Sequence, residues 1–82
     1  MGRASRERPE KLPEKLFQIR SGLGLSQNEM LVKLGLSEKV SRSAVSQYEL
    51  GTREPSLIVV LKYARLANVT ADVLIDDSLD LP

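Results

Sequence analysis

The chain has 82 residues, of which 41% are hydrophobic, and a formal net charge of +1, which fits one small domain that we expect in the cytoplasm. It contains no cysteine and no histidine, which excludes disulfides and thiolate metal sites and removes the commonest catalytic base and metal ligand. The longest apolar run, Leu57 to Leu61, is far short of the roughly 20 residues that span a bilayer. We therefore expect no enzyme activity, no cofactor or metal, and no membrane contact.

Residues 1–11 are basic, and we expect them to form a flexible arm. The segment contains Arg3, Arg6, Arg8 and Lys11, together with Pro9. A basic arm can follow a DNA backbone or enter a minor groove. A disordered terminus that binds no partner explains the same residues somewhat better than a DNA-binding arm does.

The expected domain, residues 12–76, opens with an amphipathic helix. Pro13 suits a first helical position, and Gly22 and Gly24 end the pattern. Between them, apolar residues recur at the spacings of one buried helix face: Leu12, Leu16, Ile19 and Leu23.

Two shorter helices follow. Ser26 and Glu29 have the spacing of a capping box, which opens a second helix that Gly35 closes. A third helix starts within Ser41–Ser43 and ends at Gly51. A capped helix, a turn containing glycine and a second short helix together form a unit of helix-turn-helix character.

The remaining helices are predicted over Leu57–Ala67 and Thr70–Ile75, and no strand pattern competes with them. The inner stripe of the first of these is expected to consist of Leu57, Val60, Leu61, Ala64 and Ala67. The sequence therefore predicts an all-α bundle of five short helices.

The outer face of the third helix is small and mostly polar. On a helical wheel it carries Ser43, Ser46, Gln47 and Leu50, with Arg42 at its edge. Such a face fits a major groove about 12 Å wide, in which arginine and glutamine side chains can hydrogen-bond base edges. Taken alone, however, the pattern is better explained by a helix face that is simply exposed to water than by one that reads DNA.

Three segments resemble the Cro and phage-repressor type (XRE) helix-turn-helix family. Gly24–Met30 (GLSQNEM) is similar to its G-L-S-Q-x-E-L opening, and Ser41–Gly51 (SRSAVSQYELG) resembles its recognition helix, S-x-x-[ST]-[IV]-S-x-x-E-x-G. Thr52–Leu57 matches the G-x-x-x-P-s-L that follows. In the last two helices, the positions where the family places A, L, V, S and L are occupied by Ala64, Ala67, Val69, Thr70 and Leu74. The likeness covers about Leu16 to Ile75, in the right order, and implies a lambda-repressor-like bundle that binds double-stranded DNA and regulates transcription, with the third helix in the major groove.

The resemblance also implies roles for individual residues. Four side chains are expected to contact bases: Arg42, Ser43, Ser46 and Gln47. Three are expected to contact the DNA backbone: Gln27, Thr52 and Arg53. Arg20 and Glu49 match a pair that forms a partly buried, structural salt bridge in this family.

The turn between the second and third helices departs from the family pattern. Such a turn normally has three or four residues. Here Gly35–Val40 lies between the two helices, and the sequence joining the two motifs is about four residues longer than the family pattern. Leu31 also stands where the family usually has a small alanine. We expect both features to affect how the third helix is placed.

A second apolar stripe on the fourth helix suggests a homodimer, which would place two recognition helices ~34 Å apart on a pseudo-palindrome. The expected interface is Ile58, Val59, Tyr63 and Leu66. Alternatively, the acidic tail, residues 77–82, folds back over this stripe within one monomer. The sequence also leaves open a protein-interaction module, antitoxin-like or adaptor, that uses the stripe and the tail to bind a protein partner.

Overall fold

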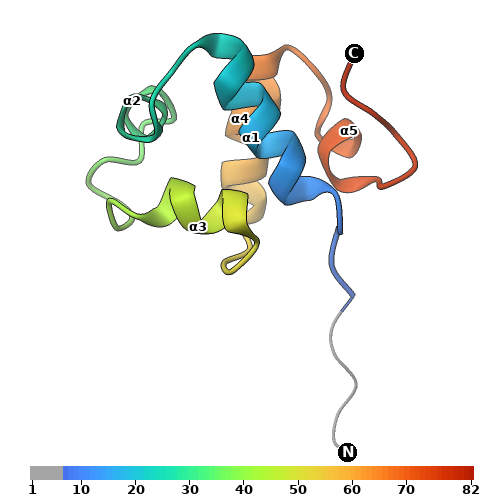
Figure 1. Cartoon of the computed structure of the whole chain (residues 1–82), viewed down its shortest axis with the longest axis horizontal. Helices are drawn as coiled ribbons and strands as arrows, with labels where there is room; N and C mark the ends of the chain where they lie inside the picture. The colour runs from blue at the N-terminus through green and yellow to red at the C-terminus, as the bar shows by residue number, and fades with distance from the viewer. Residues whose placement is uncertain (1–6) are drawn as a thin grey trace, which may run out of the picture.

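The computed structural model describes residues 7–82, and within them the chain forms helices and turns without a β-strand. The helices are α1 (Leu12–Leu23), α2 (Gln27–Lys33), α3 (Ala44–Leu50), α4 (Leu57–Ala67) and α5 (Ala71–Ile75) (Figure 1). The predicted all-α class and its five helices are confirmed. Arg3 and Arg6 of the expected arm lie outside the described residues. No helix in residues 7–82 has the length and apolar character needed to cross a membrane.

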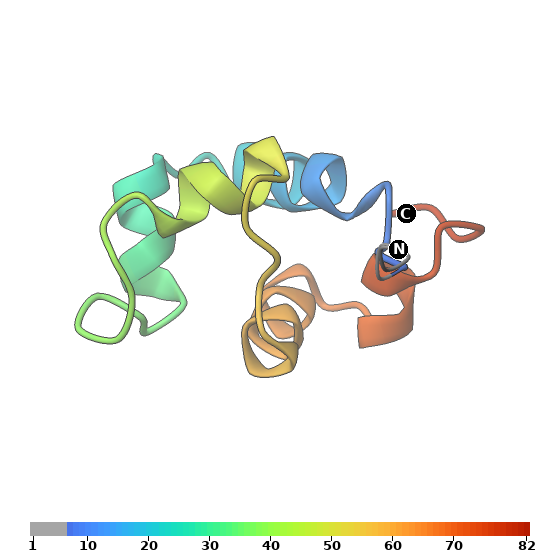
Figure 2. The ribbon, with the colours of Figure 1, turned by 90° about the horizontal axis from the view of Figure 1, so that it is seen from below.

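Helix α1 carries the core on which the other elements pack. Leu12, Leu16 and Ile19 are buried, as the apolar stripe predicted, whereas Leu23 is 43% exposed. Gly24 ends the helix in the left-handed region, with a φ of 70°. α1 contacts α3, α4 and α5, and Figures 1 and 2 show α3 crossing below it while α4 lies behind.

Helix α2 begins at the predicted capping box. The Ser26 hydroxyl accepts a hydrogen bond from the Glu29 amide at 3.0 Å, and the Glu29 carboxylate accepts one from the Ser26 amide at 2.8 Å. Two backbone donors at the helix start are thereby satisfied. Met30 and Leu31, on the next turn, are buried and pack α2 into the core.

The lengthened turn between α2 and α3 is present and has an apolar anchor. Leu36 is buried, and its carbonyl accepts hydrogen bonds from the amides of Lys39 at 2.9 Å and Val40 at 3.2 Å. Val40 packs, partly buried, against the core. Because α2 and α3 remain in contact, the extra residues fold into an ordered turn and leave the helix pair intact.

Helix α4 buries part of its predicted inner stripe together with part of the stripe expected outside. Val60 and Ala64 are buried as predicted, with exposed fractions of 4% and 1%. Leu57, expected inside, is 80% exposed, whereas Tyr63, expected outside, has an exposed fraction of 0%. Val59 is also buried, Ile58 is exposed and Leu66 is partly buried. The prediction that Val59 and Tyr63 lie on an outer stripe is therefore wrong, because α4 is covered both by α5 and by the α1–α3 side, where Tyr63 lies close to Tyr48 and Glu49.

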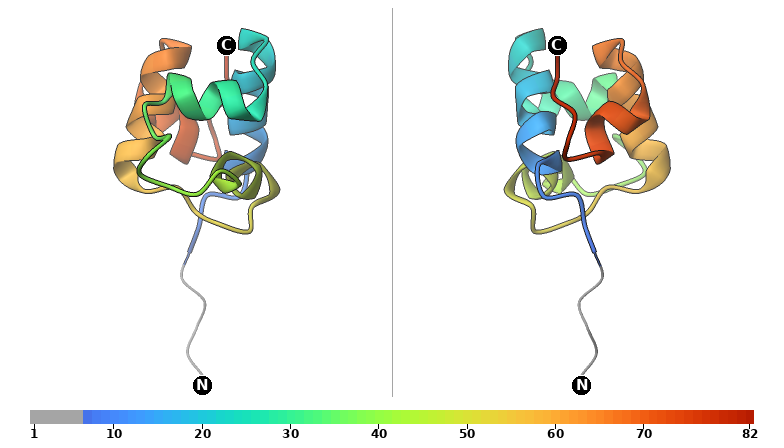
Figure 3. Two further views of the ribbon diagram at one scale, coloured as in Figure 1. Left: turned by 90° about the vertical axis from the view of Figure 1, so that its left-hand side faces the viewer. Right: turned by 90° about the vertical axis from the view of Figure 1, so that its right-hand side faces the viewer.

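The segment expected as a separate acidic tail is part of the packed domain. The Asp77 carboxylate accepts hydrogen bonds from the backbone amides of Glu10 and Lys11 at 2.9 and 3.0 Å. Leu81 packs against the core, and Figure 3 shows residues 76–82 passing between α1 and α5. The segment therefore lies mainly against α1 and α5, and only its end, Leu81 and Pro82, borders the α4 stripe, at Leu66.

Candidate nucleic-acid interface

Three buried side chains determine which face of helix α3 is turned toward the core. Ala44 and Val45 have exposed fractions of 0%, and Tyr48 is 2% exposed. The opposite side of the helix must therefore face outward. It presents Ser46 and Gln47, both half-buried, and Leu50, which is 72% exposed.

Arg42 and Ser43 lie in the turn that leads into α3 and not on its first turn. The helix begins at Ala44, and Ser43 stands at the N-cap position without a side-chain capping hydrogen bond. Its hydroxyl oxygen lies 3.4 Å from that of Ser41. Arg42 and Ser43 are both exposed, so their side chains extend the outer face of α3 beyond the helix itself.

The loop after α3 is tied to the helix through one carbonyl. Gly51 adopts a φ of 78° and ends the helix. The carbonyl oxygen of Gln47 then accepts hydrogen bonds from the amides of Thr52 at 3.1 Å and Arg53 at 3.3 Å. Thr52 and Arg53 are the residues predicted to contact the DNA backbone. They are therefore held at a fixed position relative to Gln47, which is predicted to contact a base.

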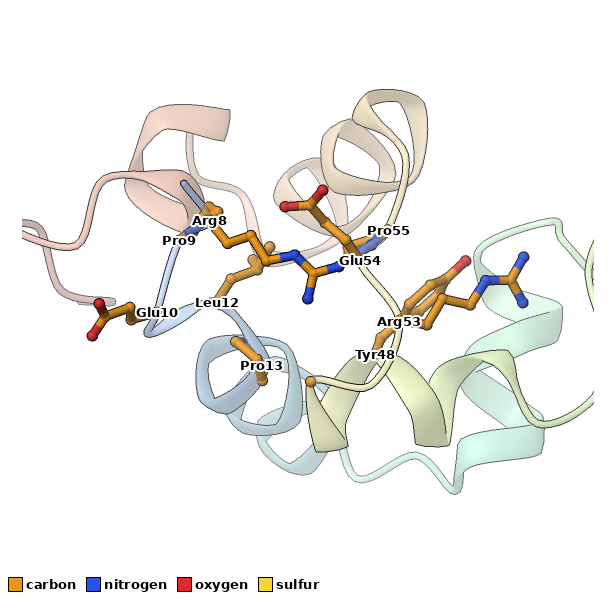
Figure 4. Close-up of a pocket in the computed structure, with 10 residues that line it drawn as sticks. Arg8, Pro9, Glu10, Leu12, Pro13, Tyr48, Arg53, Glu54 and Pro55 are labelled. Carbon is orange, nitrogen blue, oxygen red and sulfur yellow. The ribbon is translucent and has the colours of Figure 1, made fainter. Parts of the chain in front are cut away.

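A groove of about 270 Å³ separates this loop from the end of the N-terminal segment (Figure 4). The Arg53 guanidinium lies over the Tyr48 ring at 5.8 Å from its centre. Arg8 extends from the other side of the groove toward Glu54 and Pro55. The described part of the predicted arm therefore runs beside the α3–α4 loop.

The structure brings Arg20 and Glu49 together and adds a third member, Gln27. Arg20 Nε lies 2.6 Å from Glu49 Oε2, and the two side chains are 16% and 7% exposed. Gln27 Nε2 donates to Glu49 Oε1 at 3.1 Å. The hydrogen bond to Glu49 raises the pKa of Arg20 above its ordinary value, against the opposing effect of burial. The pair is thus a charged hydrogen-bonded cluster at the junction of α1, α2 and α3.

The contact between Gln27 and Glu49 could not be found from the sequence. The two residues are 22 positions apart. The family motif gives them separate roles, Gln27 as a contact to the DNA backbone and Glu49 as a partner in the salt bridge. Only the crossing of α2 and α3 places the two side chains within hydrogen-bonding distance. Nothing in residues 7–82 groups three or more acidic side chains as a metal-ion site would require.

Comparison with known proteins identifies the fold. The sequence profile of the helix-turn-helix family matches residues 16–74, which is most of the chain. The chain belongs to this helix-turn-helix family. The resemblance to repressor-type domains inferred from the three motifs is thereby confirmed. No curated protein matches the chain significantly.

Three solved structures share this helix-turn-helix fold. The restriction-modification controller protein C.AhdI from Aeromonas hydrophila is 31% identical, with a TM-score of 0.64 and coverage of 79% of this chain and 92% of that one. The P22 c2 repressor, solved with a synthetic operator, is 24% identical, with a TM-score of 0.67 and coverage of 80% and 94%. A hypothetical transcription factor from Neisseria, NHTF, is also 24% identical, with a TM-score of 0.65 and coverage of 89% and 86%. The chain is thus a repressor-like helix-turn-helix domain.

Proposed function

We propose that this helix-turn-helix domain is a transcription regulator that binds a specific double-stranded DNA sequence with α3 in the major groove. The observation that carries the proposal is the orientation of α3. Burial of Ala44, Val45 and Tyr48 leaves an outer face that is polar except for Leu50 and lies next to an exposed arginine. Hydrogen-bonding groups on such a face can read base edges. The P22 c2 repressor, which shares the fold, was solved in complex with a synthetic operator, and this supports DNA binding by the present domain.

The proposed contacts divide into two kinds. Base edges are contacted by Arg42, Ser43, Ser46 and Gln47. The sugar-phosphate backbone is contacted by Gln27, Thr52 and Arg53. Phosphate contacts set affinity and register, and their number determines how steeply binding weakens with salt, whereas base contacts set the sequence. The two kinds are therefore separable by experiment.

Selection from a random-sequence duplex pool, repeated at two salt concentrations, tests this function. We expect an enriched motif with wild-type protein. The combined variant Arg42→Ala and Gln47→Ala is expected to bind weakly and without a motif, because two base-reading side chains are lost. The control is Arg65→Ala, a change to an exposed arginine on α4. Binding by the wild type that is weak at every sequence and abolished by moderate salt would refute sequence-specific recognition.

The domain is further proposed to act as a homodimer through an apolar surface on α4 and α5. Leu57, Ile58 and Ile75 are 80%, 61% and 41% exposed, and Leu57 and Ile75 line one shallow groove. A contiguous exposed apolar patch is a common mark of a protein–protein interface. Figure 2 shows α3 and the first turn of α4 on opposite sides of the fold. A dimer joined at this surface therefore leaves both copies of α3 free to contact DNA.

This interface differs from the one expected from the sequence. Ile58 is retained, whereas the buried Val59 and Tyr63 are not available to a partner. Sedimentation equilibrium of wild type and Leu57→Asp tests it, because an aspartate in the first turn of α4 suits the helix dipole and leaves folding intact. We expect a dimer for the wild type and a monomer for the variant, while Val32→Asp, at another exposed apolar position, stays dimeric. A wild type that is monomeric at every concentration contradicts the dimer.

The alternative of a protein-interaction module receives less support. It relies on the apolar stripe of α4 together with the acidic residues 77–82 as its working surface. In the structure Asp77 is bound to the start of α1 and Leu81 packs against the core. A partner would first have to displace these contacts.

A further inference from the structure

The carboxylate of Glu49 links two parts of the proposed DNA interface by hydrogen bonds. These parts are Gln27, proposed to contact a phosphate, and α3, proposed to contact bases. Its Oε1 accepts hydrogen bonds from Arg20 Nη2 at 3.0 Å and from Gln27 Nε2 at 3.1 Å, while Oε2 accepts one from Arg20 Nε at 2.6 Å. Gln27 is the first residue of α2, and Glu49 lies in the last turn of α3. One side chain thus connects the start of α2 to the helix that carries the base-reading face.

Arg20 in turn fixes the carboxylate in place. Its third hydrogen bond, from Nη1 to the carbonyl of Leu25 at 2.9 Å, anchors it to the turn between α1 and α2. The ring of Phe17 covers the guanidinium, with 5.3 Å between the guanidinium carbon and the ring centre. Because Glu49 is 7% exposed and bound on both oxygens, it has little freedom to turn away from Gln27.

We propose that Glu49 is a positioning residue for DNA binding, which holds the Gln27 amide at a fixed distance from the base-reading face of α3. The proposal rests on the proposed function, in which Gln27 contacts a phosphate. A glutamine amide has two N–H donors, and the bond to Glu49 takes one and leaves the other for a phosphate oxygen. A side chain already held in its bound orientation loses less rotamer freedom when DNA binds. The ion pair therefore serves recognition as well as folding.

A double-mutant cycle on the duplex selected by the wild type tests this coupling. Gln27→Ala is expected to weaken binding about tenfold, as the loss of one charged hydrogen bond does. In a Glu49→Ala background the same change is expected to weaken binding less than twofold, because the amide is no longer held. Glu49→Gln keeps an acceptor oxygen and is expected to retain most of the Gln27 effect.

Phosphate ethylation interference supplies a readout that a purely structural role would not move. One ethylated phosphate is expected to weaken the wild type and to lose its effect in both Gln27→Ala and Glu49→Ala. The control pair is Gln18 and Glu14, whose side chains make the same kind of hydrogen bond at 3.0 Å on the exposed surface of α1. Alanine variants there are expected to leave affinity and the interference pattern unchanged.

Urea unfolding establishes that each variant is folded before its binding is compared. Where Glu49→Ala does not fold, the background becomes Arg20→Met with Glu49→Met, since apolar replacement of a buried ion pair often preserves stability. A Gln27→Ala effect of equal size in both backgrounds overturns the positioning role alone. No effect in the wild type overturns both the positioning role and the proposed phosphate contact of Gln27. A wild type that selects no duplex overturns the proposed function, and the positioning role falls with it.

Discussion

The carboxylate of Asp77 accepts a hydrogen bond from the backbone amide of Lys11 at 3.0 Å, although the two residues are 66 positions apart. Lys11 is the N-cap residue of α1, and its own side chain makes no capping hydrogen bond. A carboxylate at this position accepts hydrogen bonds from the amides of the N-cap residue and the residue before it, and complements the helix dipole. The last residues of the chain therefore cap its first helix.

This contact predicts a stability difference that depends on pH. The amides of Lys11 and then Glu10 hold the pKa of Asp77 below its ordinary value, which is about 3.9 in the unfolded chain. The stabilisation is therefore present at neutral pH and is lost as the pH falls through the lowered pKa. Asp77→Asn is expected to unfold at lower urea concentration than the wild type at pH 7, with a difference that shrinks toward pH 2.

The matched control is Asp80→Asn, at an exposed position of the same segment. It is expected to unfold like the wild type at neutral pH. The capping role would be refuted by an Asp77→Asn difference that is as large at pH 2 as at pH 7.

A second prediction concerns Lys15, which is 4% exposed. Its ammonium group donates to the carbonyls of Val73 at 2.8 Å and Asp76 at 3.0 Å, at the end of α5. Lys15→Met keeps an unbranched apolar side chain but removes both donors, and should lower the free energy of unfolding by about 1.5–3 kcal/mol, the range for hydrogen bonds to a charged group. Urea titration measures it, with Lys33→Met, an exposed lysine, as the control that stays within about 0.5 kcal/mol of wild type. An equal effect of both changes would mean that the α5 contacts contribute nothing.

Local sequence signals predicted the helices, because each helix end is determined within a few residues. Ser26 and Glu29 make the capping box, and Gly24 and Gly51 both adopt the left-handed conformation that ends a helix. The buried face of α1 follows from a regular apolar spacing. These features need no information about tertiary contacts.

The buried face of α4 could not be chosen in the same way. Leu57, Ile58, Val59 and Val60 are consecutive apolar residues, so the helix is apolar on nearly every side and its period does not select a direction. The position of α5 and of the α1–α3 side decides that Tyr63 points inward. Lys15 likewise follows the pattern of a surface residue, and only the return of residues 73–76 to α1 explains its burial.

The candidate site was predictable as a set of residues but not as a network. The motif places Gln27, Gln47 and Glu49 at known spacings, and the turn residues Thr52 and Arg53 follow directly. The motif does not contain the contact between Gln27 and Glu49, which depends on the crossing of α2 and α3. Nor does it contain the start of α3 at Ala44, which leaves Arg42 in the turn.

Glycine substitutions test the junction of α1 and α3. Gly51 has a φ of 78°, and a Cβ added there would lie 3.3 Å from Pro13 Cγ. Gly51→Ala is therefore expected to lower the free energy of unfolding by about 1–2 kcal/mol, the cost of a left-handed alanine. Gly22, within α1, has nothing within 4 Å of an added Cβ, so Gly22→Ala should raise it by about 0.5–1 kcal/mol. Thermal unfolding of both variants measures the two changes in stability. Changes of the same sign would contradict the difference expected between the two glycines.

Removal of the Tyr63 hydroxyl is expected to stabilise the protein, whereas most substitutions in a protein core destabilise it. It is buried, and within residues 7–82 it has no hydrogen-bond partner. Burial, together with the nearby Glu49 carboxylate, raises the pKa of Tyr63 above its ordinary value, so the group stays neutral and carries only the cost of its desolvation. Tyr63→Phe removes one polar atom without opening a large cavity, and we expect it to raise the free energy of unfolding by about 1–3 kcal/mol, the penalty of an unsatisfied buried group. Urea unfolding at pH 7 measures the change, with Tyr63→Leu as the control that loses the ring and destabilises. A loss of stability in Tyr63→Phe would mean that the hydroxyl has a favourable partner in the folded protein, and the Arg20–Glu49 cluster, whose charges act on Tyr63, is the first candidate.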